Sequence, residues 1–254
     1  MSAGKNKSGK IGLAVTHRYY NYGTMLQAFA AFHKIKSLGY DPEIINFRGI
    51  YKTIRSRKLF YYAKKLINPS IVREKSQIVF SKLRAKFNKE FGRNIAIRKR
   101  AFDDFCDKNF TVSREFSSWE DLSSSCRDYN AVIVGSDQLW LPSNIAGDFF
   151  TLNFVPDDIK KISYATSFGV NYVEKSQQEK AKKFLSRINF LSVREKSGQE
   201  IIKSLTGRDS ELVCDPTMLM TSQEWDNCTF SNNISKYTQG GVRSLLLYGH
   251  KQVA

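Results

Sequence analysis

The chain has 254 residues, of which 41% are hydrophobic and 13% aromatic, and its 40 Lys and Arg residues outnumber 24 Asp and Glu residues to give a net charge of +16. This length and composition exclude a disordered chain and allow one large α/β domain or two small ones. The sequence holds neither a membrane-spanning apolar run nor the apolar stretch of a signal peptide, so we expect a cytoplasmic protein in which residues 1–9 form a flexible lead.

Cysteine and histidine usage argues against a metal site. The four cysteines are widely spaced without a CxxC pair, and none of the three histidines lies near a cysteine pair. Scattered thiols in a chain without an export signal are usually reduced and structural. We therefore expect reduced thiols and no zinc site, and we expect His17 and His33 to lie on the surface or in the core with their hydrogen bonds satisfied.

The first elements predict a βαβ unit. Residues 10–16 are apolar enough for a strand, and residues 24–38 carry apolar side chains at helical spacing. Thr24 is the expected N-cap of that helix and Gly39 its expected end. Residues 42–47 predict the second strand, so the connection between the two strands should be right-handed.

Most of the excess charge lies in one segment. Residues 51–100 contain 16 Lys and Arg residues but only two acids. Helical spacing over residues 51–66 and 76–91 predicts that residues 51–110 are a basic helical insertion in the α/β domain. Such an insertion could lie on an anionic membrane surface, follow a polyanion such as nucleic acid, or be a solvated charged face. No nucleic-acid-binding signature accompanies it, so nucleic acid ranks last.

The most informative segment is residues 131–140, with the sequence AVIVGSDQLW. A short β-branched run ends at Gly135 and predicts a buried strand followed by a tight turn. Ser136, Asp137 and Gln138 then place a hydroxyl, a carboxylate and an amide at the carboxyl end of the strand, where ligands bind in open α/β sheets. The alternative is that Ser136 or Asp137 only caps the next helix.

Strands and helices alternate through the rest of the chain. Strands are predicted at residues 161–168, 190–193 and 211–214, and helices at residues 174–188 and 197–205. Ser197 is the expected N-cap of the second helix. The alternation predicts a mainly parallel α/β sheet with helices on both faces.

Five short motifs occur at the predicted strand ends. They are Asn21-Tyr22-Gly23 with Leu26-Gln27-Ala28, Val134-Gly135-Ser136-Asp137-Gln138 with Trp140, Tyr164-Ala165-Thr166-Ser167-Phe168-Gly169, Ser192-Val193-Arg194-Glu195 with Ser197, and Asp215-Pro216-Thr217 with Trp225. In this order the chain resembles the polysaccharide pyruvyl transferase family over roughly residues 10–226. The resemblance implies that residues 10–226 form a Rossmann-like domain, the first half of a two-domain glycosyltransferase-like fold.

The resemblance also implies a reaction and its partners. Similar proteins move the enolpyruvyl unit of phosphoenolpyruvate onto two hydroxyls of a sugar and make a pyruvate ketal in surface polysaccharide synthesis. Phosphoenolpyruvate would be a co-substrate, with no further cofactor. The acceptor would be a sugar, and a lipid-linked sugar would suit a basic segment that lies at the inner face of a membrane.

One feature of the family is missing. Its second half carries a Ser-Phe-His segment whose histidine is the expected acid, and no Ser-Phe-His occurs here. We expect residues 227–254 to be a remnant of the linker and second domain in a truncated chain. The alternative function is therefore a catalytically inactive domain that binds a sugar, a phosphate or a partner chain.

Two residues are the candidates for catalytic roles. Arg194 follows a strand and precedes a helix, so its guanidinium and the helix N-terminus would favour a carboxylate or phosphate. The alternative is an ion pair with Glu195 or another surface acid. Asp137 could accept a proton from a sugar hydroxyl, or hold the sugar by hydrogen bonds.

The remaining candidates would contact substrate. Asn21, Tyr22 and Gly23 are expected to form the first βα loop, where Gly23 lets the backbone approach a ligand. The expected substrate-binding set is Asn21, Tyr22, Gly23, Gln27, Ser136, Gln138 and Glu195. Asp215 is interpreted as a structural turn before Pro216, and Trp140 as a core residue.

Overall fold

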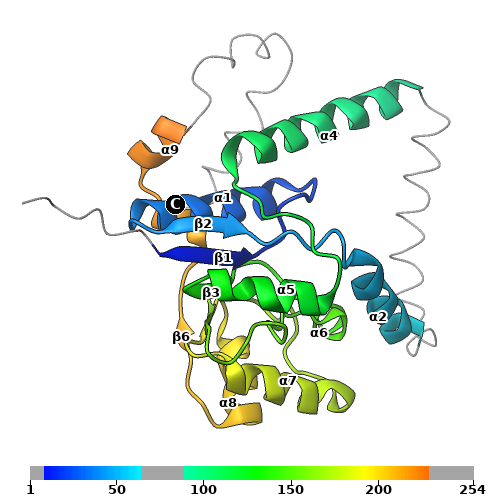
Figure 1. Cartoon of the computed structure of the whole chain (residues 1–254), viewed down its shortest axis with the longest axis vertical. Coiled ribbons are helices and arrows are strands. Elements are labelled where there is room, and N and C mark those ends of the chain that lie inside the picture. Colours follow the sequence, from blue (N-terminus) through cyan, green and yellow to red (C-terminus); the bar gives the residue numbers. More distant parts are fainter. Residues whose placement is uncertain (1–8, 64–88, 229–254) are drawn as a thin grey trace, which may run out of the picture. The chain divides into compact units, whose positions relative to one another are not determined.

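The computed structural model describes residues 9–63 and 89–228 (Figure 1). The chain forms two units, residues 1–219 and residues 220–254. The described elements of the first unit are β1 (Lys10–Ala14), α1 (Tyr22–Ser37), β2 (Asp41–Ile44), α2 (Tyr51–Ala63), α4 (Lys89–Asn109), α5 (Trp119–Ser125), β3 (Ala131–Val134), α6 (Pro142–Gly147), β4 (Lys160–Ser163), α7 (Lys175–Arg187), β5 (Ser192–Val193), α8 (Lys196–Thr206) and β6 (Glu211–Leu212). Two 3₁₀ helices, Cys126–Asp128 and Pro216–Leu219, complete it. The described part of the second unit is residues 220–228, which include helix α9 (Ser222–Cys228).

The sheet is parallel throughout its paired strands. Four strands pair in the order β2-β1-β3-β4, and β5 pairs with β6. A bridge between Thr166 and Val193 connects the end of β4 to β5, and a bridge between Ile44 and Val112 adds a short segment outside β2. The resulting order is that of a Rossmann-like fold, with its topological switch between β1 and β3. The predicted fold class is confirmed.

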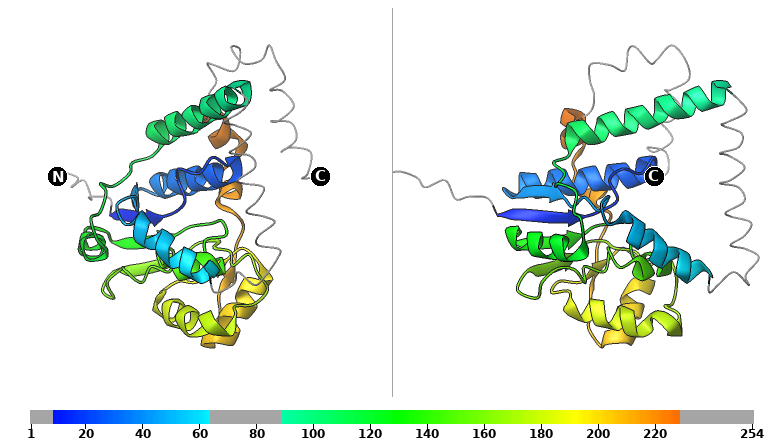
Figure 2. Two further views of the ribbon diagram at one scale, coloured as in Figure 1. Left: turned by 90° about the vertical axis from the view of Figure 1, so that its right-hand side faces the viewer. Right: turned by 45° about the vertical axis from the view of Figure 1, so that its right-hand side comes forward.

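The basic segment joins β2 to the segment at Val112. Thr111 and Ser113 exchange backbone hydrogen bonds with Ile44, so after α4 the chain returns to lie beside β2. The helix predicted at residues 51–66 corresponds to α2, and most of the helix predicted at 76–91 lies outside the described residues. All three views place α4 at the β2 end of the first unit and α7 and α8 at the other end (Figure 2).

Alternating side chains give the sheet two buried faces. Ala14, Val132 and Val134 belong to a large apolar cluster that includes Leu122 of α5 and Phe184 of α7. Because Leu13 is also fully buried but points the other way along β1, the second face is covered as well. The sheet is therefore buried on both sides, as parallel sheets usually are.

Aromatic pairs fix the helices to each other on both sides. Phe29 and Phe32 of α1 contact Phe105 of α4 and Phe110, with ring centroids 5.6 Å and 5.5 Å apart, respectively. Trp140 is fully buried against Phe168 and Phe184, and its indole N–H donates to a backbone carbonyl. The prediction that Trp140 is a core residue is confirmed.

Two predicted helix starts are wrong. The N-cap of α1 is Asn21, whose Oδ1 accepts the N–H of Thr24 at 3.2 Å, so Tyr22 and Gly23 form the first turn of α1 and are not part of a loop. Asparagine is as good an N-cap as any residue, and the Thr24 hydroxyl is used elsewhere. Helix α8 begins at Lys196, before Ser197. The predicted end of α1 is confirmed, because Gly39 follows it with a φ of +87°.

No helix within residues 9–63 and 89–228 is both long enough and apolar enough to cross a bilayer.

Burial raises the pKa of the Cys106 thiol to about 11 and that of the Cys126 thiol to about 12. Such thiols stay protonated near neutral pH and pack as small apolar groups.

Replacing Gly135 by alanine should destabilise the fold. A Cβ at this position would lie 2.6 Å from Cγ1 of Val15, a fully buried and conformationally stiff side chain. We expect the free energy of unfolding to fall by about 1–3 kcal/mol, measured by urea denaturation. The control is Gly207→Asn, at an open position with a φ of +71° that asparagine tolerates. Equal losses in the two variants would contradict the close approach at Gly135.

Candidate functional site

The carboxyl ends of the strands carry the candidate side chains. Asp137 follows β3, Arg194 follows β5, and Asp215 follows β6. Because all of these strands are parallel, their carboxyl ends lie at one edge of the sheet, the carboxyl edge. Helix α1 also begins at this edge, beside the switch point between β1 and β3.

Asp137 is held against the first turn of α1. The Thr24 hydroxyl donates to Oδ2 of Asp137 at 2.8 Å, and the N–H of Gln138 donates to Oδ1 at 2.8 Å. The backbone at Asp137 has a φ of +83°, a left-handed conformation that aspartate adopts more readily than most residues. This conformation turns the carboxylate toward α1. The carboxylate thus has neutral donors and remains partly exposed, so it can accept a further hydrogen bond from a ligand.

Asp215 connects three strand ends. Its Oδ2 accepts the hydroxyl of Ser136 at 2.7 Å and Nη1 of Arg194 at 3.0 Å. Its Oδ1 accepts the hydroxyl and the backbone N–H of Thr217 at 2.8 Å and 3.0 Å. Burial alone would raise the pKa of Asp215, but the hydrogen bonds from Ser136, Thr217 and Arg194 outweigh burial and lower it. Asp215 is therefore an ionised acceptor at neutral pH.

Arg194 is positioned by Asp215 and not by Glu195. Within the described residues its recorded partner is Asp215, and the Arg194 side chain stays 35% exposed. A guanidinium has five N–H donors, so further donors can face a ligand. Glu195 occupies the N-cap position of α8, and its Oε1 accepts the N–H of Phe168 at 3.0 Å. The predicted alternative of an Arg194–Glu195 pair is thus replaced by a pair across the sheet edge.

The other predicted residues surround the start of α1 or lie beside it. Gln27 is buried, its Nε2 donates to the Thr24 carbonyl at 2.9 Å, and its Oε1 has no hydrogen-bond partner among the described residues. Tyr22 points outward, 57% exposed, with the Arg98 guanidinium over its ring at 5.3 Å. Gln138 is exposed and lies close to Gly169.

The structure therefore forms two groups from the predicted residues. Asn21, Gln27 and Asp137 gather around the first turns of α1 through Thr24. Ser136 and Arg194 meet at Asp215. The two groups adjoin because Ser136 and Asp137 are neighbours in the chain, and the 3₁₀ helix that follows Asp215 packs against α1. Tyr22 and Glu195 face other partners.

Three residues at this edge were missed or misjudged from the sequence. Asp215 is more than a turn residue, and its position at a strand end was the same signal that marked Asp137 and Arg194. Thr24 is a hydrogen-bond donor to Asp137 and not an N-cap. His17, beyond the end of β1, is 5% exposed, and burial lowers its pKa to about 4. Its Nδ1 has no hydrogen-bond partner within the described residues, contrary to the expectation of a satisfied histidine.

No group of three or more His, Cys, Asp or Glu side chains in the described part of the chain is arranged to hold a metal ion. The two groups at the edge contain the Arg194 guanidinium, the carboxylates of Asp137 and Asp215, and neighbouring hydroxyls and amides.

Replacing Asp215 by asparagine should cost about 1–3 kcal/mol of unfolding free energy at neutral pH, because the charged acceptor of the Arg194 and Ser136 bonds is lost. The folded-state pKa of Asp215 lies below its unfolded value, so this stability is present above the unfolded pKa and is lost as pH falls through the folded one. The gap between wild type and variant should close only below about pH 4. Urea denaturation across this range measures it.

The matched control is Asp158→Asn. Asp158 is 57% exposed and pairs with Arg127, ahead of β3 at the opposite edge of the sheet. We expect this exposed pair to contribute less than about 1 kcal/mol. A loss in Asp215→Asn no larger than that in the control would contradict the connecting role of Asp215.

Comparison with known proteins gives one positive result. The model of the family described as polysaccharide pyruvyl transferase matches residues 21–238. This range includes every residue of the two groups and Asp215. No curated protein and no solved structure shows a significant match to the chain.

Proposed function

We infer the function from one premise: the chain belongs to the polysaccharide pyruvyl transferase family. A transferase that acts in polysaccharide biosynthesis follows from this membership. We propose that the donor is phosphoenolpyruvate, which enters as co-substrate, and that the product is a pyruvate ketal on a sugar of a surface polysaccharide. The proposed reaction needs no resident cofactor.

The proposed reaction replaces two bonds at C2 of the donor by two new ones. Two sugar oxygens form bonds to C2, while the bond from C2 to the phosphate oxygen and the π bond from C2 to the methylene carbon break. One hydroxyl proton is balanced by protonation of the methylene carbon, which becomes a methyl group, and the other leaves with inorganic phosphate. The chemistry thus requires positive charge near the donor's carboxylate and phosphate, and an acceptor for hydroxyl protons.

The arrangement at the carboxyl edge supports these roles. Arg194 offers N–H donors to the donor's carboxylate or phosphate, and Asp215 fixes its orientation. Asp137 is the proposed acceptor of a hydroxyl proton, with Thr24 holding its carboxylate in place. Asn21, Gln27, Ser136 and Gln138 are the proposed polar contacts around them. The single observation that carries the proposal is that Asp215 accepts hydrogen bonds from both Ser136 and Arg194. These bonds bring Arg194, the candidate anion site, to the same edge as Asp137, the candidate base next to Ser136.

The test is pyruvyl transfer by the full chain. Phosphoenolpyruvate is incubated with UDP-glucose, UDP-galactose or a polyprenyl diphosphate-linked disaccharide, and the ketal methyl group is detected by NMR. We expect ketal formation with at least one acceptor. We expect Arg194→Ala to weaken phosphoenolpyruvate binding about 10- to 100-fold, because charge-assisted hydrogen bonds contribute about 1.5–3 kcal/mol.

The control is Arg127→Ala, which removes an arginine with an aspartate partner at the opposite edge of the sheet. Equal effects of the two variants on phosphoenolpyruvate binding would reject the role of Arg194. Binding of phosphoenolpyruvate without turnover on any acceptor would reject the transferase and support the alternative, a catalytically inactive binding domain.

We also propose that the basic segment lies on an anionic membrane surface, where a lipid-linked acceptor would be found. On α2, Leu59 is 52% exposed and Phe60 65% exposed, and the exposed cations Lys52 and Arg55 lie on the same helix. Apolar side chains flanked by cations are typical of helices that lie in a membrane interface.

Binding to vesicles that contain phosphatidylserine should weaken as NaCl rises, because salt screens the attraction between exposed charges. Leu59→Ser should weaken binding further at any salt concentration, since it removes apolar area and leaves the charge unchanged. Sedimentation with vesicles measures both effects. Salt-independent binding, or equal binding to neutral phosphatidylcholine vesicles, would contradict the proposal.

A further inference from the structure

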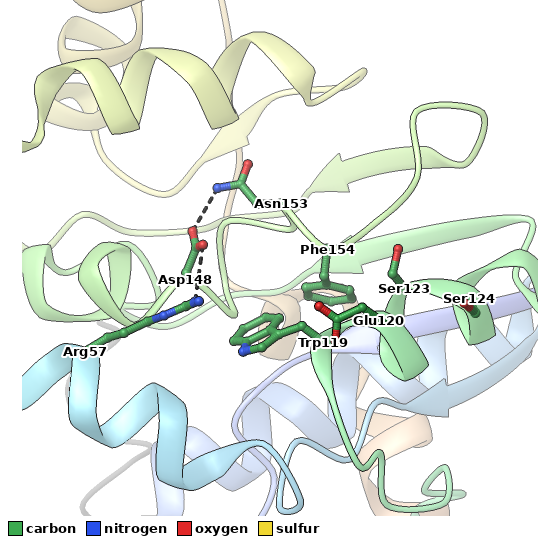
Figure 3. Close-up of a pocket in the computed structure, with 8 residues that line it drawn as sticks. All are labelled: Arg57, Trp119, Glu120, Ser123, Ser124, Asp148, Asn153 and Phe154. Atoms are coloured by element: carbon green, nitrogen blue, oxygen red, sulfur yellow. Dashed lines mark hydrogen bonds and ion pairs between the residues drawn. The ribbon is translucent and has the colours of Figure 1, made fainter.

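A second region of the first unit is hollowed, and none of the strand-end residues lines it. It is an open, solvent-facing cavity of about 450 Å³ between α2, α5 and the segment after α6 (Figure 3). Its wall includes Arg57 from α2, Trp119, Glu120 and Ser123 from α5, and Asp148 and Asn153. Its volume falls in the range of small-molecule sites.

One carboxylate organises the polar wall of this cavity. Asp148 accepts Nδ2 of Asn153 at 2.8 Å and forms ion pairs with Lys180 at 3.1 Å and Arg57 at 3.5 Å. Its backbone is left-handed, with a φ of +73°, at the end of α6. The dashed contacts in Figure 3 show Arg57 and Asn153 converging on Asp148. The wall is therefore oriented before any ligand arrives, which reduces the entropy lost on binding.

An aromatic surface lies next to this polar wall. Arg57 places its guanidinium over the Trp119 ring at 4.8 Å, and the ring of Phe154 lies 6.1 Å from that of Trp119. The indole Nε1 of Trp119 is buried and has no hydrogen-bond partner in the described part of the chain. Buried indole N–H groups usually have a partner, so this donor is left unsatisfied within the described residues.

The acids in the wall are acceptors for hydroxyl groups. The backbone N–H of Glu120 and the Ser118 hydroxyl lower the pKa of Glu120, so its exposed carboxylate is ionised near neutral pH. An ionised carboxylate accepts hydrogen bonds and donates none. Ser123 adds a hydroxyl and Asn153 an amide to the same wall.

The charge and chemistry of the wall select one class of ligand. The carboxylates of Asp148 and Glu120 are balanced by Arg57 and Lys180, which both pair with Asp148, so the wall has no excess charge that would attract an anion or a cation. A neutral ligand with an apolar face and several hydroxyls fits both parts of the wall. Pyranose sugars have these properties, because the C–H groups of one face pack on an aromatic ring while the hydroxyls donate to carboxylates.

We propose that this cavity is a saccharide subsite that binds a neutral pyranose residue of the acceptor glycan; its assignment to the acceptor rests on the proposed function. Helix α6 joins the two regions. The carbonyl of Gln138, beside Asp137, accepts Nδ2 of Asn144 at 3.0 Å, and Asp148 follows the same helix. A six-residue helix rises about 9 Å, a length that a short oligosaccharide spans.

The binding test uses the full chain without phosphoenolpyruvate. Methyl α-D-galactopyranoside, methyl β-D-glucopyranoside and methyl N-acetyl-β-D-glucosaminide are titrated, and saturation-transfer NMR measures binding. We expect millimolar binding of at least one glycoside, about 10-fold weaker in Glu120→Gln and lost in Trp119→Ala. Glu120 is exposed, so its variant tests the subsite even where Trp119→Ala perturbs folding. The matched control is Tyr172→Ala, which removes an aromatic ring that is 71% exposed elsewhere and should leave binding unchanged.

The outcomes separate the subsite from the pyruvyl transfer. Absence of binding by all three glycosides, or equal binding by wild type and Glu120→Gln, would overturn the subsite whether or not ketal forms. Glycoside binding that depends on Glu120, in a chain that forms no ketal, would retain the saccharide site and reject the transferase. Where ketal does form, a raised KM for the acceptor in Glu120→Gln with an unchanged KM for phosphoenolpyruvate supports the subsite, and unchanged KM values for both overturn it.

Discussion

The carboxylate of Asp215 is the interaction on which the carboxyl edge of the sheet depends. It accepts hydrogen bonds from Ser136 after β3 and Arg194 after β5 while it sits after β6. Charge-assisted bonds of this kind contribute about 1.5–3 kcal/mol each, more than neutral ones. They also fix the orientation of the Arg194 guanidinium, because a partly exposed arginine without such a partner would take several orientations. The orientation of Arg194 thus follows from a single, partly buried acceptor.

The strand order gives this acceptor its partners. Because β1 and β3 lie on either side of the switch point, the loops after them separate and leave room for the start of α1. Asn21 caps that helix, and the Thr24 hydroxyl is then free to hold Asp137. Local capping and the position of a candidate base are therefore linked: a helix that began at Thr24, as its sequence suggested, would not present the same hydroxyl.

The sequence predicted the features that depend on residues close together in the chain. The predictions failed for contacts between residues that are far apart in the chain. The run AVIV predicted β3 to the residue, and Gly39 marked the end of α1. The motifs at strand ends identified Ser136, Asp137 and Arg194, because parallel topology alone brings such ends to one edge. The role of Asp215 was missed because its partners are 79 and 21 residues away along the chain. The cavity was missed for the same reason, since it needs α2, α5 and α6 in place.

The two regions of the first unit differ in charge in a way that suits two different substrates. At the carboxyl edge, Arg194 pairs with Asp215 and still has further N–H groups for hydrogen bonds. An anionic substrate such as phosphoenolpyruvate would be attracted there. At the cavity, Asp148 is already shared between Arg57 and Lys180, and Glu120 adds a further negative charge, so an anion gains little. A neutral glycan gains instead from the aromatic ring and the fixed acceptors. Separation of charge along α6 would thus keep donor and acceptor from competing for one place.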